Sequence, residues 1–573
     1  MNPARMSSIL GIILSALALV FAPAVSASPT GSIAGSVKDQ TGALVSGAKL
    51  TLTSISTNAK IGAISDSNGS FQFLQLAPAV YSLQVEANGF KKVVVDNVVV
   101  EVDQITHVDA TLQIGSVAET IEVASEAIPL LETDRSTLSN VVESQVISNM
   151  PLNARQYLDL ALLTPGVLPS SAGTQGGGFN VSGARSQANI FLLDGVSNID
   201  TQINSALGNF RITDAVQEFA VQTSVATAEF GRGTGGQVSI VTKSGTNTFH
   251  GTAFEYLRNS VLDAADFFTN KNHGTKNPLH RNQYGGTLGG PILKDRMFFF
   301  TSYEGFRQVA PTVSTTRVPT AAERATVTDP ISLSLLQFWP APNFTPTSGA
   351  NNFIANVGST TFDETGLAKV DYNFSEKDHL SGRWAQYGGT AFTPGALPLL
   401  GGNGNAPVSE SGVLNHTHTF SARLLNEIRV GFSRNKTFIT VQDSGFDAST
   451  IFVDSSGNPL PGVVHASTNH LDSGLPTINV SGGFAPLGST SNLPQGRITN
   501  TYELFDNVSL IAPFGASRHS WRWGVHARRE DARRFLDGSA RGQFSFSNFA
   551  DFAAGRVNTA TLLFGSTLVS CPA

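Results

Sequence analysis

Apolar and polar side chains alternate along much of the second half of this chain. Ile428, Val430 and Phe432 alternate with charged or polar residues, and the same pattern recurs in residues 367–374 and 519–528. A period of two places successive side chains on opposite faces of an extended segment. The pattern therefore predicts β-strands that have one apolar and one polar face.

These predicted strands are joined by connections that alternate between short and long. The strands are 248–258, 282–292, 296–308, 364–374, 379–388, 410–421, 427–440, 499–511 and 519–531, with a weaker one near 541–547. The short connections are 293–295, 375–378, 422–426 and 512–518, and the long ones are 259–281, 309–363, 389–409 and 441–498. Outer-membrane β-barrels have short periplasmic turns and long external loops in this way. Residues 246–573 are therefore predicted to form the N-terminal part of a transmembrane antiparallel β-barrel, with lipid against the aromatic faces and water against the others.

The N-terminal part of the chain predicts an exported protein with a small β-domain. Residues 1–27 have the pattern of a cleaved signal peptide, with Arg5, an apolar stretch and a small-residue cleavage site. Residues 29–114 hold short alternating runs and the turn 66–69, which predict an immunoglobulin-like β-sandwich. The spacing resembles the carboxypeptidase regulatory-like domain, a carbohydrate-binding-like fold, at Gly35, Val37, Asp39, Gly42, Gly47, Ala48, Asp66, Gly69, Phe71, Leu76, Pro78, Tyr81, Leu83, Val85, Gly89 and Phe90. Glycan binding by this module is an expectation from fold analogy alone.

Residues 126–245 mix short helical and strand-like segments with many glycines. The segments PLNARQYLDLALLTPGV (151–167), SGARSQANIFLLDGV (182–196), 215–219 and AEFGRGTGGQVSIVTKSGTNTFHG (228–251) follow one another in this order. Together they resemble the plug domain of Oar-like TonB-dependent outer-membrane receptors, in which Gly is common where Ala154 stands here. The fold is therefore expected to be mainly β, with an immunoglobulin-like sandwich, a plug domain and part of a barrel.

Several charged residues of this predicted plug are candidates for a latch inside a water-filled barrel. They are Arg155, Arg185, Asp194, Glu229 and Arg232. Charges in such a lumen must be paired or hydrated, and breaking a buried pair is costly. Pairs among these side chains would either be released by a coupling force or serve as static contacts between plug and barrel wall.

Residues 115–125 form an acidic, extended stretch between the sandwich and the plug. Glu119, Ile121 and Val123 fall in an alternating run that a partner protein could add as a strand to the edge of its own sheet. The family resemblance implies that a TonB-type energy-coupling protein would be that partner. The alternative is a plain linker.

Composition excludes several other classes of protein. Only 14% of the 573 residues are charged and the net charge is −6, which argues against a basic nucleic-acid-binding surface. The single cysteine, Cys571, cannot form an intrachain disulfide. No catalytic motif is evident in the sequence. Gly231-x-Gly233-x-x-Gly236 matches the glycine pattern of a nucleotide site, but it precedes a strand-like run instead of the helix that such a site needs. We therefore expect neither an enzyme nor a bound cofactor or metal, and His416 and His418, which share one face of a barrel strand, are expected to be ordinary lumen-facing residues, with a surface metal site as the alternative.

The resemblance implies a receptor that binds a bulky extracellular ligand, such as a glycan, a peptide or a metal chelate, and imports it across the outer membrane. About ten predicted strands, compared with the 22 of plugged transporters, lead us to expect an incomplete barrel. The alternatives are a surface adhesin or envelope-organising protein that binds without transporting, and a truncated fragment with no function of its own.

Overall fold

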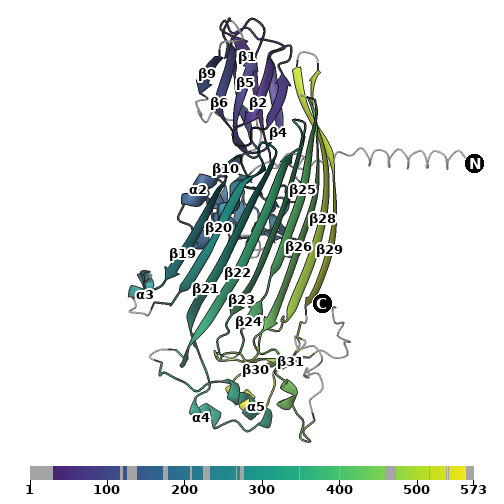
Figure 1. Ribbon diagram of the computed structural model, residues 1–573. Helices are drawn as coiled ribbons and strands as arrows, with labels where there is room; N and C mark the ends of the chain where they lie inside the picture. The colour runs from purple at the N-terminus through teal and green to yellow at the C-terminus, as the bar shows by residue number, and fades with distance from the viewer. Residues whose placement is uncertain are drawn as a thin grey trace, which may run out of the picture.

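The computed structural model describes residues 30–562, except for a set of internal segments. The excepted residues are 116–119, 125–137, 172–177, 207–209, 224–230, 232, 266, 272–275, 347–348, 399, 422, 459–472, 515–516, 537 and 540. The predicted signal peptide, Glu119, Glu229, Arg232 and Cys571 lie outside the described residues. The described chain consists of a small N-terminal β-domain, a curved sheet of long strands around a compact middle region, and a layer of loops at the far end (Figure 1).

The N-terminal domain is a two-sheet β-sandwich. Its strands are β1 (Gly31–Asp39), β2 (Lys49–Ser54), β3 (Lys60–Ile64), β4 (Ser70–Leu76), β5 (Ala79–Glu86), β6 (Lys92–Val100), β7 (Ile105–His107) and β8 (Ala110–Leu112). One sheet has the order β4-β1-β7, with β8 also pairing β1, and the other has the order β3-β2-β5-β6-β9. Alternate residues along the strands are buried and form one apolar core that includes Ile33, Leu52, Phe71 and Leu83. The predicted strand alternation thus buries one face of each sheet.

The segment that links the sandwich to the middle region contains a strand. β9 (Thr120–Ala124) pairs in parallel with β6, from Lys92 opposite Thr120 to Asp96 opposite Ala124. The prediction for 115–125 left a linker and a strand-forming segment open. In the structure its centre is a strand at the edge of the sandwich's own sheet.

The middle region, residues 138–245, is here called the plug. It contains β10 (Ser139–Glu143), α2 (Ser144–Asn149), the 3-10 helix η2 (Tyr157–Leu163), β11 (Val167–Pro169), β12 (Phe179–Val181), β13 (Ile190–Leu193), β14 (Val196–Ser197), β15 (Ile199–Asp200), β16 (Ser205–Ala206), β17 (Val216–Gln222) and β18 (Gln237–Thr242). Its main sheet has the order β10-β17-β18-β13-β14. Phe191, Phe219 and Ile240 are among the buried residues of its core. Gly233 and Gly236 lie close to Ile190 and Val181, so these two glycines permit packing within the plug and form no nucleotide loop.

Long antiparallel strands form the wall around the plug (Figure 1). They are β19 (His250–Asn259), β20 (His280–Leu293), β21 (Met297–Thr316), β22 (Phe353–Asn373), β23 (Asp378–Thr393), β24 (Asn403–Asn405), β25 (Val408–Ser421), β26 (Leu424–Val441), β28 (Gln495–Phe514) and β29 (Ser517–Leu536), and α3 (Phe267–Lys271) lies between β19 and β20. Nine of these correspond to the nine predicted strands, and most extend further into the long connections than predicted. The short turns are therefore all at one end of the wall and the long loops at the other.

Side chains on the wall alternate between an inner face against the plug and an outer face, as the sequence predicted. On β26, Glu427 and Arg429 are buried against the plug side, whereas Ile428 and Val430 are exposed on the outer face. Trp521 and Trp523 of β29 are also exposed on the outer face. Two aromatic residues of the wall lie on the inner face: Tyr256 stacks with the plug residue Arg155, and Tyr387 is buried against Phe210.

The long loops at the far end pack together into a cap with its own apolar core. The cap contains α4 (Ala321–Arg324), α5 (Pro330–Leu335), β27 (Thr477–Val480), β30 (Gln543–Phe546), α6 (Phe549–Ala553) and β31 (Thr559–Thr561). Trp339 is buried at its centre, and its indole Nε1 donates to the carbonyl oxygen of Ala485 at 2.8 Å. The predicted weak strand near 541–547 forms as β30, but it pairs with β27 and β31 in the cap and not with the wall.

Candidate functional site

An extensive polar contact lies between the plug and the inner face of the wall. The alternation of the wall strands directs a row of charged and amide side chains inward, and turns of the plug direct carboxylates, arginines and backbone groups outward to meet them. Three groups of contacts can be distinguished, centred on Asp194, on Arg155 with Arg211, and on Asp200.

The first group is centred on Asp194, at the turn between β13 and β14. Its Oδ2 accepts from Nε of the wall residue Arg383 at 3.0 Å and from the Thr242 hydroxyl at 2.9 Å, and its Oδ1 accepts from the Thr242 backbone N–H at 2.9 Å. Arg383 also donates to the carbonyl oxygens of Leu193 at 3.0 Å and Ser411 at 2.7 Å. One wall guanidinium therefore holds both a side chain and a backbone carbonyl of the plug.

Electrostatics keep the Asp194 carboxylate charged although it is buried. Burial by itself raises the pKa of a carboxyl group. Lys369, Arg383 and the hydrogen bonds from Thr242 outweigh burial, so the pKa of Asp194 lies below its ordinary value. Lys369 also donates to the Thr242 carbonyl oxygen at 3.0 Å. The site is thus a carboxylate between two wall cations.

The second group involves two plug arginines. Arg155 donates to Asp214 of the plug at 2.8 Å and lies 3.8 Å from Glu304 of the wall. Arg211 pairs with Asp363 of the wall at 3.2 Å, and its guanidinium lies 3.7 Å from the centre of the Phe306 ring. Each arginine therefore combines an ion pair with an aromatic face on the wall strands.

The loop that presents Arg155 has an unusual backbone. Ala154 and Arg155 have φ values of 54° and 52°, in the left-handed region. A residue with a Cβ atom is strained there, whereas glycine is not. This explains why a glycine is common at the position of Ala154 in the family that the sequence resembles. The Ala154 carbonyl oxygen accepts from Arg211 at 3.2 Å, which ties the two arginine sites together.

The third group holds the segment that follows Asp194. The carboxylate of Asp200 accepts from Arg497 and from Asn435 of the wall, both at 2.7 Å. The Ser197 backbone N–H donates to Glu503 at 2.9 Å, and the fully buried Arg429 donates to the Gly195 carbonyl oxygen at 2.9 Å. Three wall strands, β23, β26 and β28, thus contact a plug segment of only seven residues, 194–200.

Close packing accompanies these polar contacts at one point. A Cβ atom placed on Gly431 of β26 would lie 2.6 Å from Cγ1 and 3.1 Å from Cβ of Val196. Such distances are shorter than normal van der Waals contact, so only glycine permits the plug to approach the wall here.

The five predicted latch residues do not lie together in the structure. Asp194 and Arg155 lie at the plug–wall boundary, but they do not pair with each other. Arg185 is exposed and forms no ion pair within the described part of the chain. Glu229 and Arg232 lie outside the described residues. Sequence reasoning did not name the wall partners Arg383, Asp363, Arg429, Glu503 and Arg497, although the charged face of the alternating strands was a signal that could have found them.

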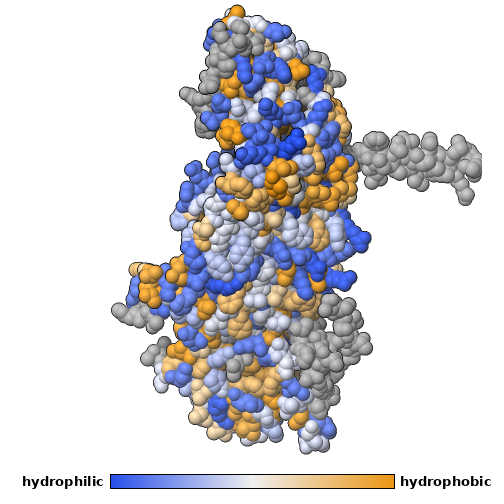
Figure 2. Space-filling model, viewed as in Figure 1, coloured by the Kyte–Doolittle hydropathy of each residue, from blue (hydrophilic) through white to orange (hydrophobic). Residues whose placement is uncertain are grey.

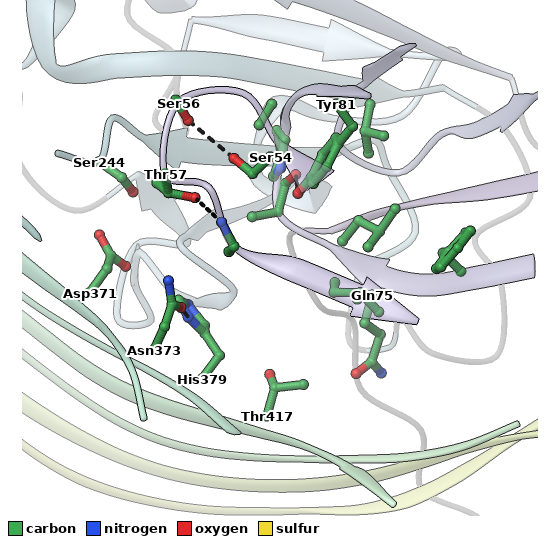
Figure 3. Close-up of a pocket in the computed structure, with 18 of the residues that line it drawn as sticks. Ser54, Ser56, Thr57, Gln75, Tyr81, Ser244, Asp371, Asn373, His379 and Thr417 are labelled. Carbon is green, nitrogen blue, oxygen red and sulfur yellow. Dashed lines mark hydrogen bonds between the residues drawn. The ribbon is translucent and has the colours of Figure 1, made fainter. Parts of the chain in front are cut away.

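A second feature is a cavity between the sandwich, the plug and the turn end of the wall (Figure 3). It encloses about 950 Å³. Ser54, Ser56 and Thr57 of the sandwich lie on one side of it, and Asp371, Asn373 and His379 of the wall on the other (Figure 3). The sandwich also contacts the wall directly, because Gln75 donates to the Ser509 hydroxyl at 3.3 Å. The lining of the cavity contains both acidic and basic side chains and indicates no single ligand class.

Among the residues that the structure describes, no cluster of three or more His, Cys, Asp and Glu side chains has an arrangement that could hold a metal ion. His416 and His418 both face Asp378, at 3.4 and 2.6 Å. Within the same described ranges no helix has the length and apolar character needed to cross a membrane.

Comparison with known families is decisive for the wall. The model of the family described as outer membrane beta barrel domain matches residues 241–328 and 325–570, which together are more than half of the chain. The chain belongs to this outer-membrane β-barrel family. The model of a second family, described as carboxypeptidase regulatory-like domain, matches residues 32–113, which form the sandwich.

Individual relatives of this outer-membrane β-barrel protein are similar to it over parts of their length. The TonB-dependent transporter Oar from Myxococcus xanthus is 27% identical over 270 residues, which cover 44% of this chain and 24% of that protein. The outer membrane transporter YddB from Escherichia coli aligns with a TM-score of 0.49 at 12% identity, over 74% of this chain and 51% of that one. The siderophore receptor PirA from Acinetobacter baumannii aligns with a TM-score of 0.43 at 13% identity, over 70% of this chain and 49% of that one.

These matches confirm the predicted resemblance to Oar-like TonB-dependent receptors with an N-terminal carboxypeptidase regulatory-like domain. The two family models also confirm the predicted mainly β fold class with a sandwich and outer-membrane barrel strands. The matched part of the chain spans about a quarter of the curated relative and about half of each solved structure.

Proposed function

We propose that this protein is an outer-membrane receptor that imports a bulky nutrient with energy supplied by a TonB-type protein. The nutrient class is a glycan, a peptide or a metal chelate. In this proposal the sandwich and residues 115–125 lie in the periplasm, the cap lies at the cell surface, and the plug blocks the barrel until force displaces it. The Oar relative, which is named a TonB-dependent transporter, supports the proposal.

The observation that carries the proposal is the large number of polar contacts at the plug–wall boundary, which accompany a smaller apolar contact with Phe300, Leu367, Ala385 and Tyr387. An apolar boundary would resist separation in water, because separation would expose apolar surface. Ion pairs and hydrogen bonds can be exchanged for water, so a modest force can separate such a boundary without unfolding the plug. The Asp194–Arg383, Arg211–Asp363 and Asp200–Arg497 contacts are of this kind.

The position of β9 is consistent with a route for that force. One edge of β9 pairs with β6, and β9 is the last strand in the order of its sheet. A partner strand could therefore add to the other edge by β-augmentation. Ile121 and Val123 lie in this strand, and the chain continues from it into the plug, so a pull on β9 would be transmitted to the plug.

An engineered disulfide between plug and wall tests the proposal. Val196→Cys and Gly431→Cys place two Cβ atoms 3.1 Å apart, so the strand and the plug turn must separate slightly to reach the 3.5–4.5 Å of a disulfide. Cys571→Ser removes the native thiol. Uptake of three labelled probes, a dextrin, a peptide and a ferric catecholate, would be measured in energised cells that express the complete gene.

Uptake of at least one probe is expected with the reduced double cysteine variant, and it should be lost on oxidation and restored by dithiothreitol. Deletion of 115–125 should also abolish uptake but leave binding of the probe to the cell surface intact. Uptake that continues in the oxidised variant would reject displacement of the plug, and uptake that survives the deletion would reject coupling through β9.

The cap favours one other candidate function, a surface adhesin. A cap with its own apolar core, built around Trp339, could present a binding surface without any need for transport. Binding of a probe with no uptake in the intact, energised protein would favour the adhesin.

A further inference from the structure

Towards the loop end, the outer face of the wall carries three rows of side chains in register across β26, β28 and β29. The pairing places Phe432, Tyr502 and Arg529 in the first row. The second row, nearer the loops, consists of Arg434, Asn500 and Asp531, and the third of Lys436, Ile498 and Arg533. Directly paired residues of antiparallel strands share one face of the sheet, so all nine side chains are on the outer face.

The first row continues an aromatic group that is typical of a membrane interface. The rings of Trp384 and Phe432 are stacked with centres 6.0 Å apart, and those of Phe432 and Tyr502 are 5.4 Å apart. Towards the turn end, the outer face is apolar at Val430, Leu504 and Val525, all of which are exposed. Aromatic residues gather where the hydrocarbon layer meets the headgroups. The two rows beyond the aromatic group therefore lie at headgroup level.

These headgroup-level rows are rich in cations. Arg434, Lys436 and Arg533 belong to these rows, and Arg529 of the first row adjoins them. Among the described residues of the three rows and their pairing partners on β25, the carboxylates are Asp531 and Glu410. Arg529 pairs with Asp531 at 3.1 Å and is 77% exposed. Hydrophilic residues gather on the β29 side of this face in Figure 2.

Three of the four cations have no ionic partner within the described ranges. Arg434 and Arg533 form no ion pair there, and the amino group of Lys436 only lies 5.0 Å from the Phe438 ring centre. At the plug boundary, in contrast, Arg383, Arg211, Arg497, Lys369 and Arg429 each bind a carboxylate or a carbonyl group. The outer cations therefore do not hold the fold together, and their charge is available to an external group.

We propose that this basic belt, defined as Arg434, Lys436, Arg529 and Arg533, binds the phosphate groups of lipopolysaccharide in the outer leaflet. The inference rests on the proposed function in one respect, because it takes the loop end of the wall as the cell-surface end. Lipopolysaccharide is the phosphorylated lipid of that leaflet, and the guanidinium group of arginine binds phosphate through two parallel hydrogen bonds.

The spacing of the belt suits a lipid with more than one phosphate. Arg434 and Lys436 are two residues apart on one strand, which is about 7 Å. Lys436 and Arg533 are two strands apart, which is about 10 Å. One phosphate cannot contact all the cations at these separations, whereas the separated phosphates of one headgroup can.

The test compares two triple variants of the full chain that lose the same charge. In the belt variant, Arg434→Gln, Lys436→Gln and Arg533→Gln remove the three unpaired cations. In the control variant, Lys49→Gln, Lys60→Gln and Lys294→Gln remove three exposed lysines of the sandwich and the first turn. Both are extracted from outer membranes in a mild detergent, and the lipopolysaccharide retained per protein is measured by mass spectrometry.

The belt variant is expected to retain less than a third of the lipopolysaccharide that the parent protein retains, and the control variant is expected to match the parent. Equal retention by the belt variant and the parent would overturn the proposal. Equal stabilisation of the parent by added phosphatidylglycerol, inorganic phosphate and lipopolysaccharide, measured by thermal unfolding, would also overturn it, because a general anion effect would then explain the binding.

One further readout keeps the test decisive. If the belt variant does not fold, the parent protein is washed at 0.1 M and 1 M NaCl, which shortens the screening length from about 10 Å to about 3 Å. Retention should fall at least threefold at high salt, and unchanged retention contradicts the proposal. The assay needs no transport, so a receptor that fails the disulfide test but retains lipopolysaccharide through the belt would lose the proposed uptake function and keep this inference.

Discussion

The sandwich and the plug are both small β-regions of this chain, but different interactions hold them in place. The sandwich is closed by a continuous apolar core in which Ile33, Leu50 and Leu83 have no exposed surface. The plug also has an apolar core, which extends to Phe300, Leu367, Ala385 and Tyr387 of the wall, but its boundary with the wall additionally holds many ion pairs, amides and backbone hydrogen bonds. The sandwich is therefore stabilised from within, whereas the position of the plug is determined by a polar surface.

This difference in stabilising interactions indicates which region can move as a unit. Removing the plug from the wall replaces its polar contacts with contacts to water and exposes only the part of its core that packs against Phe300, Leu367, Ala385 and Tyr387 of the wall. Opening the sandwich exposes its core, which costs roughly 25 cal/mol for each Å² of apolar surface. A force applied between the two regions would accordingly displace the plug before it unfolded the sandwich.

The largest expected effect comes from breaking the buried pair at the plug boundary. Asp194→Ala leaves Arg383 buried without its carboxylate and should lower the free energy of unfolding of the plug–wall unit by about 3–5 kcal/mol. Urea unfolding in detergent measures it. Asp531→Ala, which breaks an exposed pair, should cost less than about 1 kcal/mol. Equal effects of the two substitutions would contradict a buried latch.

A truncation in the sandwich core should have a similar but confined effect. Leu52→Ala removes a side chain with no exposed surface and should destabilise the sandwich by about 2–5 kcal/mol. Hydrogen exchange should increase in β1–β8 and stay unchanged in the plug. Ile55→Ala, at a half-exposed position, should change little. Faster exchange in the plug of Leu52→Ala would show that the two regions are not independent.

Overpacking the closest contact between plug and wall should have a moderate effect. Gly431→Ala adds a Cβ atom 2.6 Å from Val196 and should cost about 1–3 kcal/mol in thermal unfolding. Combining it with Val196→Ala should recover part of the loss. Gly366→Ala is the matched control, because nothing lies within 4 Å of its added Cβ atom. A loss that Val196→Ala does not reduce would place the strain elsewhere.

The smallest effect concerns the contact between the plug and the sandwich. Glu218 is buried and accepts a hydrogen bond from the backbone N–H of Val102. Burial raises the pKa of Glu218 from 4.5 to about 8, despite that hydrogen bond, and Glu101 and Glu143 add to the shift. A carboxyl group whose pKa is raised on folding stabilises the fold while it is protonated. That stability is complete below about pH 4.5 and is lost as the pH rises through about 8.

The melting temperature of the parent protein should therefore fall by a few degrees between pH 6 and pH 9. Glu218→Gln keeps a neutral side chain of the same shape and should remove most of this fall. The comparison of the two melting curves at each pH is the measurement. Identical pH profiles for the two proteins would assign the pH dependence to other groups.

Sequence reasoning could predict the wall and its two faces because strand alternation is a local property. Ile428 and Arg429 are neighbours in the chain, and the pleat of a strand sends them to opposite sides in any sheet. It could not predict the partner of Asp194, because Arg383 lies 189 residues away and many inward cations were equally plausible. Nor could it predict that β30 joins the cap, since a run of four alternating residues fits any sheet edge.

The sequence by itself determined the order of the regions, the strand periods, the turn and loop alternation and the family resemblance. These follow from short-range patterns, in which backbone geometry and burial act on residues close together in the chain. Only the tertiary structure decided that β9 pairs with the sandwich, that the long loops share a core, and which charges meet at the plug boundary. Those contacts join residues far apart in the chain. Which of them form depends on how well whole surfaces fit together and on whether the new contacts compensate for the loss of hydration.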